Sequence, residues 1–278
     1  MNEWKNYGVS ALGLGTTGYW SGINKGLDQC IETAFYEYGI NVFDTAEMYG
    51  NGRCEEALGK AVRAFPRDRV FLISKILPDN VKEDTFEQYL DNSLARLKTD
   101  YIDLYLLHWR ANCELSLLVK KMEEAVQSGR IRRWGVSNFD TCDLKDLLAI
   151  AGGENCFCNQ IFFNIYERGP ETELLPFMKT NGILPMSYSS LGSGYHPHPD
   201  IHAVTEIEAA CRENGVSAES VMLKFNTKAG FLTLFSTASL SHLKKDLQEV
   251  TEEQYAKLVP LFDRAFPAPD HTYPLVKI

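Results

Sequence analysis

Four polar residues in the first half of the sequence have side chains that could work together in proton transfer. Asp44, Lys75 and His108 each lie at the carboxyl end of a short apolar run, and Tyr49 follows Asp44 closely. A tyrosine hydroxyl has a pKa near ~10, and an adjacent ammonium favours the phenolate and lowers that pKa. Asp44 paired with Lys75 would keep the ammonium charged, while His108 could donate a hydrogen bond to a substrate oxygen. The set suits general acid catalysis on a carbonyl, or general base catalysis on an alcohol.

Each of the four residues also has an ordinary structural explanation. Asp44 could be a helix cap or a turn acid, and a tyrosine before a glycine, such as Tyr49, is common in turns. A lysine often flanks a strand, and a histidine can be a buried core residue. Their joint placement favours catalysis over these separate explanations. The set does not suit nucleophilic acyl transfer, because it includes no activated Ser or Cys, and one His, one Asp and one Lys are poor metal ligands together.

The apolar runs belong to a repeating pattern of strands and helices. Eight short apolar runs predict buried strands, over residues 9–15, 41–46, 70–75, 102–108, 132–138, 158–164, 182–190 and 231–237. Amphipathic stretches predict helices between them, over residues 23–39, 83–98, 115–130, 141–153, 171–180, 201–214, 218–228 and 240–247. In the first of these helices Ile23 and Tyr38 fall on the apolar stripe, and Gly39 ends it.

This alternation predicts an α/β protein built as a (β/α)8 TIM barrel, with one domain over residues 1–278. A doubly wound open sheet is the alternative, because LGLGTTG gives Gly13, Gly15 and Gly18 the G-x-G-x-x-G spacing. The first two glycines fall inside a strand run and no long helix opens there, which favours the barrel. The carboxyl ends of barrel strands meet at one rim, where the four polar residues would converge.

Composition limits the classes of partner. The net charge of −9 disfavours nucleic-acid binding, which needs a cationic face. No apolar run approaches the ~18 residues that span a bilayer, and the first residues contain no signal core, so no membrane contact is expected.

Seven scattered cysteines fit a reducing cytoplasm, and Cys156 and Cys158 are predicted to be buried thiols. The loop at residues 194–202 has three histidines, but its prolines and the absence of a nearby acid–His spacing on a helix make a lid more plausible than a metal site, so no metal is predicted.

Several motifs, in order along the chain, resemble those of the aldo-keto reductase family. FDTAEMYGNGRCEEALGKAV resembles the D-T-A-x-x-Y-G and E-x-x-L-G signature, DYIDLYLLHW the strand-four motif and GVSNF the strand-five motif. NQIFFNIY and SYSSLGSG resemble the later N-Q-x-x-(Y/F)-(H/N) and Y-S-x-L-G segments. The resemblance covers residues 9–246.

The resemblance implies a barrel enzyme that uses NADPH or NADH to reduce an aldehyde or ketone, or that oxidises a sugar or other alcohol. It implies a catalytic tetrad of Asp44, Tyr49, Lys75 and His108, in which Tyr49 donates the proton and has its pKa lowered by Lys75 and Asp44. It also implies cofactor contacts from Gly15, Thr16 and Thr17 near the nicotinamide ribose, Ser137, Asn138 and Gln160 at the carboxamide, Tyr188 stacked on the ring, and Ser189, Ser190, Leu191 and Ser193 at the pyrophosphate.

The segment LFSTASLSHLKKDL departs from the family pattern. Phe235 replaces the usual proline, and His242 stands where an arginine commonly grips the 2′-phosphate. A neutral imidazole lacks the bidentate grip of a guanidinium, although a nearby lysine could compensate. Family habit favours NADP(H) over NAD(H), and the sequence leaves the choice open. The contacts implied in this segment are Ser236, Thr237, Ser239, His242, Lys245 and Asp246.

The substrate pocket is less well defined by the sequence. Tyr19, Trp20 and Trp109 are the candidates for its walls, and the short loops and brief tail predict a fairly open pocket for a small molecule. The protein is expected to be a monomer or a small homo-oligomer. Two other functions stay open: a retained nicotinamide could support a redox-neutral epimerisation or elimination, or the fold could serve as a non-catalytic nucleotide-sensing subunit.

Overall fold

Eight parallel strands form a closed barrel. The computed structural model of the chain describes residues 3–192, 198 and 200–277. The strands pair in sequence order, and the last strand closes on the first. The predicted barrel is therefore confirmed, and the open sheet is excluded. The strands are β1 (Leu12–Gly15), β2 (Val42–Asp44), β3 (Phe71–Ile76), β4 (Leu104–Leu107), β5 (Trp134–Ser137), β6 (Cys158–Phe162), β7 (Leu184–Tyr188) and β8 (Leu232–Phe235).

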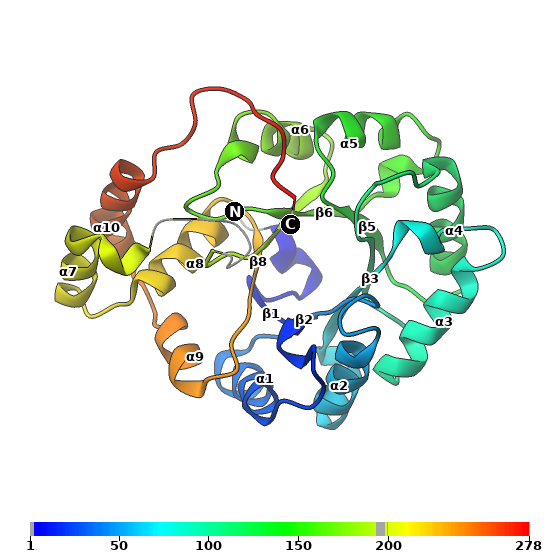
Figure 1. Cartoon of the computed structure of the whole chain (residues 1–278), viewed down its shortest axis with the longest axis horizontal. Coiled ribbons are helices and arrows are strands. Elements are labelled where there is room, and N and C mark those ends of the chain that lie inside the picture. The colour runs from blue at the N-terminus through cyan, green and yellow to red at the C-terminus, as the bar shows by residue number, and fades with distance from the viewer. Residues whose placement is uncertain (1–2, 193–197, 199, 278) are drawn as a thin grey trace.

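Helices surround the barrel as an outer ring (Figure 1). Local chemistry sets their ends: Gly39, with a φ of 66°, ends the first helix as predicted, and Asp140 caps the fifth in a capping box. The helices are α1 (Lys25–Tyr38), α2 (Arg53–Ala61), α3 (Phe86–Leu97), α4 (Leu115–Gln127), α5 (Thr141–Leu148), α6 (Leu174–Thr180), α7 (Thr205–Glu213), α8 (Ala218–Lys228), α9 (Leu240–Asp246) and α10 (Glu252–Ala265).

Two helices and one side chain differ from the sequence-based prediction. The sequence patterns miss α2, which is short and follows Gly52, a residue that offers no side-chain cap. They also miss α10, which contains Pro260, a residue that normally breaks helices. Ile23 is 78% exposed instead of buried on the apolar stripe, because Asn24 caps the helix and leaves Ile23 outside it.

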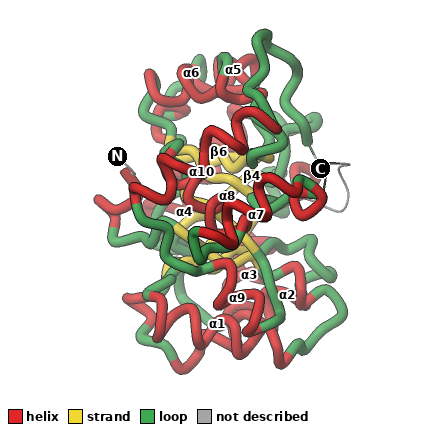
Figure 2. Tube along the Cα trace, turned by 90° about the vertical axis from the view of Figure 1, so that its left-hand side faces the viewer, coloured by secondary structure: helices red, strands yellow, loops and turns green. Residues whose placement is uncertain are grey.

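A cluster of apolar side chains fills the barrel, and an N-terminal segment packs against this cluster. Trp4 is fully buried in the cluster, and its indole N–H donates to the carbonyl of Pro185 at 2.9 Å. Its ring also meets the edge of Phe157. Figure 2 shows the two chain ends on opposite sides of the barrel. The N-terminal segment therefore packs on the end of the barrel where the strands begin, away from the carboxyl ends of the strands.

The cysteines and helix lengths give two further structural facts. All seven cysteines are free, and the prediction that Cys156 and Cys158 are buried thiols is confirmed. Across residues 3–192, 198 and 200–277, no helix is long and apolar enough to cross a membrane.

Candidate active site

The four predicted catalytic residues lie together at the carboxyl ends of β2, β3 and β4. The ammonium of Lys75 donates to the carboxylate of Asp44 at 2.6 Å, and its nitrogen is 3.4 Å from the hydroxyl of Tyr49. It also donates to the carbonyl of Thr45 at 2.9 Å. The ring of His108, which follows β4, lies with its centroid 5.6 Å from that of Tyr49.

Burial and charge act in opposite directions on the pKa of Lys75. The residue is fully buried, and burial disfavours its charged form. The carboxylate of Asp44 and the hydroxyl of Tyr49 oppose this effect by charge and hydrogen bonding, and the net result is a raised pKa for the Lys75 ammonium. A permanent cation is therefore held beside the phenol.

The pKa of Tyr49 corrects the prediction that its neighbours lower it. Burial is the largest effect and raises the pKa of Tyr49, while the charge of Lys75 lowers it and that of Asp44 raises it again. The net direction is upward. Tyr49 is therefore a protonated phenol at neutral pH, and Lys75 limits the rise instead of producing a net decrease.

His108 is a neutral imidazole in this site. Burial, helped by the charge of Lys75, lowers the pKa of His108 to about 3. Its Nδ1 atom is buried and has no hydrogen-bond partner among the described residues. A neutral imidazole beside Tyr49 can donate one hydrogen bond without adding a second cation to the site.

Polar side chains at the carboxyl ends of β5, β6 and β7 adjoin the tetrad, and they include the three residues proposed for the carboxamide. The side-chain amide of Gln160 donates to Asp44 at 2.9 Å across the barrel. Ser137 donates to the carbonyl of Gln160, and Asn138 donates to the carbonyl of His108 at 3.1 Å. The hydroxyl of Tyr188 donates to Asn138 at 2.7 Å. Amide and hydroxyl groups therefore gather next to the catalytic residues.

The residues predicted near the ribose and pyrophosphate divide into two groups. Thr16 is buried and its hydroxyl donates to the carbonyl of Asp44, so Thr16 fastens β1 to β2. Ser190 is also buried and bonded to Ser187. The backbone N–H of Thr16 also donates to the carbonyl of Asp44 at 3.0 Å, so Thr16 and the hydroxyl of Ser190 are engaged within the protein. Gly15 ends β1, Thr17 is exposed, and Ser189 and Leu191 are partly buried, whereas Ser193 lies outside the described residues.

The segment after β8 presents exposed polar residues at the start of α9. Ser236 and His242 are exposed, and Ser239 caps the helix through the backbone N–H of His242. Thr237 bonds to Ser239 within the same turn. Lys245 pairs with Glu219 of α8 at 3.0 Å. His242 and Lys244 are the other exposed basic residues of α9.

Asp246, a predicted cofactor contact, has a covered side chain. It is buried at the end of α9. Burial, with a contribution from the charge of Glu219, raises the pKa of Asp246 to about 6. The sequence gives its helix position correctly, but the packing of α9 against α8 determines that its side chain is covered.

One of the three predicted pocket walls is wrong. Tyr19 is fully buried and its hydroxyl bonds to Asp28 of α1, so it packs beneath the mouth of the barrel. Trp20 is 50% exposed with its ring centroid 6.3 Å from that of Tyr49. Trp109 lies 4.7 Å from the ring of His108. Both tryptophans are therefore next to the tetrad and stay predicted walls.

Sequence reasoning missed several residues that contact the predicted site residues and hold them in place. Gln160 also contacts the sulfur of Met186 at 2.9 Å, and Asn164 donates to the carbonyl of Ser189. Glu47, between Asp44 and Tyr49, has a buried carboxylate. A polar residue inside an otherwise buried segment is the signal that could have identified Glu47.

The histidine loop lies partly outside the described residues. Of its described members, His198 stacks on Tyr166 at 4.5 Å, and His202 pairs with Glu208 and Glu219. Within the described ranges, no group of three or more His, Cys, Asp or Glu residues could hold a metal ion.

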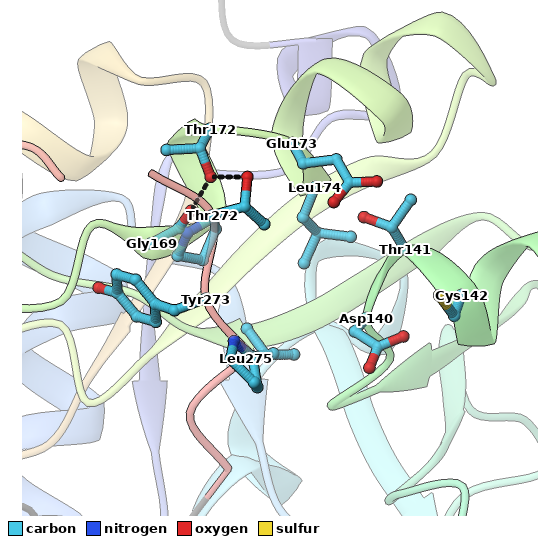
Figure 3. A pocket seen from close by; sticks show the side chains of 12 residues that line it. Asp140, Thr141, Cys142, Gly169, Thr172, Glu173, Leu174, Thr272, Tyr273 and Leu275 are labelled. Carbon is cyan, nitrogen blue, oxygen red and sulfur yellow. Dashed lines mark hydrogen bonds between the residues drawn. The ribbon is translucent and has the colours of Figure 1, made fainter. Parts of the chain in front are cut away.

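A cleft of about 230 Å³ lies beside the loops after β5 and β6 (Figure 3). The C-terminal tail crosses these loops, and Tyr273 and Leu275 line the cleft together with Asp140, Thr141 and Glu173. No residue of the tetrad lines it. The tail therefore packs over the loops after β5 and β6, and the openness of the substrate pocket beside the tetrad stays a prediction.

Comparison with known proteins identifies the family. The sequence model of the Aldo/keto reductase family matches residues 11–261. The chain belongs to the aldo/keto reductase family. This aldo/keto reductase is 33% identical to methylglyoxal reductase YeaE of Escherichia coli, over 84% of the chain and 82% of that protein. It is 30% identical to glycerol 2-dehydrogenase (NADP(+)) of Saccharomyces cerevisiae, over 85% of the chain and 81% of that protein.

Solved structures agree with this family assignment. The crystal structure of an aldo/keto reductase from Klebsiella pneumoniae in complex with NADP and acetate has a TM-score of 0.90 and 33% identity to this aldo/keto reductase. The match covers 97% of this chain and 96% of that one. The protein is thus an oxidoreductase of the aldo-keto reductase type.

Proposed function

We propose that this protein reduces a small aldehyde or ketone to an alcohol, with Tyr49 as the general acid. The observation that carries the proposal is the position of the Tyr49 hydroxyl, 3.4 Å from the ammonium that Asp44 holds at 2.6 Å. The relatives named methylglyoxal reductase and glycerol 2-dehydrogenase support a small carbonyl or polyol as substrate. Methylglyoxal is the first substrate to assay.

The raised pKa of Tyr49 keeps the phenol protonated at the start of reduction. In reduction the carbonyl oxygen gains negative charge, and the protonated phenol transfers its proton to that oxygen. The phenolate that remains is stabilised by Lys75, and His108 donates a hydrogen bond to the same oxygen. Oxidation of an alcohol follows the same path in reverse and needs the phenolate at the start.

The polar residues beside the tetrad fit a nicotinamide cofactor. The side chain of Gln160 bonds directly to Asp44, that of Asn138 bonds to the carbonyl of His108, and that of Ser137 bonds to the carbonyl of Gln160. Their amide and hydroxyl groups can pair with a carboxamide. Tyr188, held by Asn138, supplies an aromatic face. When bound, the reduced nicotinamide supplies the hydride. The protein's part is to hold the carbonyl oxygen between Tyr49 and His108.

We favour NADP(H) over NAD(H) as the cofactor. The solved relative contains NADP, and the yeast relative is named for NADP(+). In this chain the exposed Ser236 and His242 could contact a 2′-phosphate, but Lys245 is paired with Glu219. The grip on the phosphate is therefore expected to be weaker than that of an arginine, and the discrimination against NADH modest.

Replacing Tyr49 by phenylalanine tests the general acid. Tyr49→Phe removes only the hydroxyl, so kcat with methylglyoxal and NADPH should fall about 10²- to 10⁴-fold, while tryptophan fluorescence should still report nucleotide binding. Tyr36→Phe, at a position 59% exposed on α1, is the control and should retain full activity. A kcat for Tyr49→Phe close to that of the unmodified enzyme would rule out Tyr49 as the proton donor.

A further inference from the structure

Glu47 is a buried carboxylate between Asp44 and Tyr49, outside both the tetrad and the predicted cofactor contacts. It is only 6% exposed. Its Oε1 atom accepts hydrogen bonds from the backbone N–H of Leu77 at 2.7 Å and from the side-chain amide of Asn80 at 2.8 Å. Its Oε2 atom is buried without a partner among the described residues. Glu47 therefore ties the segment that carries Tyr49 to the segment that follows Lys75.

These contacts extend the pairing of β2 and β3 beyond the end of β2. The backbone N–H of Thr45 donates to the carbonyl of Ile73, and that of Glu47 donates to the carbonyl of Lys75 at 3.2 Å. The next backbone donor on the β3 side, Leu77, has no backbone acceptor among the described residues and bonds to the Glu47 carboxylate instead. The side chain thus takes the place of the next hydrogen bond of the ladder.

The chain turns immediately after this point. The backbone N–H of Tyr49 donates to the carbonyl of Ala46 at 3.1 Å, which closes a tight turn around Glu47. This turn brings the Tyr49 hydroxyl back to within 3.4 Å of the Lys75 ammonium. The position of the phenol therefore depends on where the turn begins, and Glu47 fixes that position from both its backbone and its side chain.

A carboxylate in this place is costly in free energy. Burial raises the pKa of Glu47, whereas the bonds from Leu77 and Asn80 lower it. A buried carboxylate is stable only when hydrogen bonds replace those to water, and one oxygen of Glu47 lacks such a bond. An apolar residue would avoid this cost in free energy but could not accept the hydrogen bonds from Leu77 and Asn80.

We propose that Glu47 is a positioning residue that sets the distance between Tyr49 and Lys75 by accepting the hydrogen bonds of Leu77 and Asn80. The proposal rests on the reductase function proposed above, in which Tyr49 is the acid. It assigns the role to the acceptor oxygen of Glu47 and not to the negative charge. Glutamine at this position keeps an acceptor oxygen, and alanine removes it.

Two substitutions at one site separate these roles. With methylglyoxal and NADPH, Glu47→Ala should lower kcat about 10- to 100-fold, because small displacements of a reacting group cost this much, while the Kd for NADPH changes less than about twofold. Glu47→Gln should retain at least about half of the kcat. Asn80→Ala, which removes one donor, should lower kcat by a smaller factor, and adding it to Glu47→Ala should have little further effect.

The control is a matched carboxylate, Asp103, which bonds to the beginning of β3 as Glu47 bonds to the segment after its end. Asp103 accepts hydrogen bonds from the backbone N–H of Leu72 in β3 and from Arg67, so Asp103→Ala should cost similar stability but leave kcat unchanged. A normal kcat in Glu47→Ala, an equal loss in Asp103→Ala, or a failure of Glu47→Gln to retain activity would each overturn the proposal. If Glu47→Ala does not fold, Asn80→Ala and Glu47→Gln decide the question. An inactive unmodified enzyme would instead refute the proposed function.

Discussion

Lys75 keeps its charge in a fully buried position because Asp44, Thr45 and Tyr49 surround its ammonium with oxygen atoms. The four residue types and their strand-end positions were sufficient to predict that the tetrad would assemble. The direction of the pKa shift of Tyr49 was not predictable, because burial dominates it, and burial depends on packing from loops that the motif does not include. Glu47 lies inside the motif, but its partners Leu77 and Asn80 follow β3, so the motif alone does not reveal its contacts.

His108 gives a prediction about stability at low pH. Its pKa is about 3 in the folded protein, against 6.5 for the ordinary group. The unfolded chain therefore binds a proton that the folded protein excludes, so stability is intact above pH 6.5 and is lost as the pH falls towards 3. At pH 5 this contribution amounts to about 2 kcal/mol. Urea unfolding between pH 7.5 and 5 should show this loss in the unmodified protein but not in His108→Gln.

A substitution that removes no titrating group provides the control for this measurement. Gln127→Ala, at an exposed position at the end of α4, should leave the pH dependence of the free energy of unfolding unchanged. Asp246, whose pKa is raised to about 6, contributes a slope of opposite sign. It is present in all three proteins, so its effect cancels in the differences. Parallel pH profiles for the unmodified protein and His108→Gln would contradict the assignment of His108 as a neutral residue.

At the scale of secondary structure, the strands were easier to predict than the helices. All eight apolar runs became strands because buried parallel strands have a continuous apolar sequence. The helices α2 and α10 were missed since Gly52 precedes one and Pro260 lies inside the other. Likewise, Tyr19 was misplaced because its bond to Asp28 of α1 depends on how that helix packs, not on a local pattern.

α9 gives a prediction about the cofactor. His242→Arg adds a guanidinium in the first turn of this helix, at an exposed position, so folding should not suffer. Two charge-assisted hydrogen bonds to a 2′-phosphate should tighten NADPH binding about tenfold and leave NADH binding unchanged. Fluorescence titration with both nucleotides measures this. Gln127→Arg adds the same charge at the exposed end of α4 and should change neither affinity, whereas equal tightening of both nucleotides by His242→Arg would place the 2′-phosphate elsewhere.

Across the whole molecule, the C-terminal tail joins distant parts of the barrel's mouth side. The hydroxyl of Tyr273 donates to the buried Glu167 at 2.6 Å, and Lys277 pairs with Asp143 of α5 at 3.3 Å. Asp143 also pairs with Arg110, which follows Trp109 in the loop after β4. The tail was described from the sequence only as brief, because its contacts are made with loops more than 100 residues away in the chain.

Removing one hydroxyl tests how firmly the tail is held. Among the described residues, Tyr273→Phe leaves the Glu167 carboxylate with only the backbone N–H of Gly169 as a donor, so the free energy of unfolding should fall by about 1.5–3 kcal/mol. Chymotrypsin should then cleave the tail near Phe266 faster than in the unmodified protein. Tyr38→Phe, on the surface of α1, should change neither quantity. Unchanged stability and cleavage in Tyr273→Phe would show that the bond to Glu167 does not hold the tail.

The groups that hold the catalytic ammonium belong to the barrel wall, where Asp44 ends β2 and Gln160 lies on β6. The aromatic residues beside the tetrad, Trp20 and Trp109, come from connecting loops instead. Mutational libraries confined to these loops can therefore change which compounds are accepted while the proton donor keeps its place. For an engineer, the scaffold offers one fixed reaction on which new substrate ranges can be built.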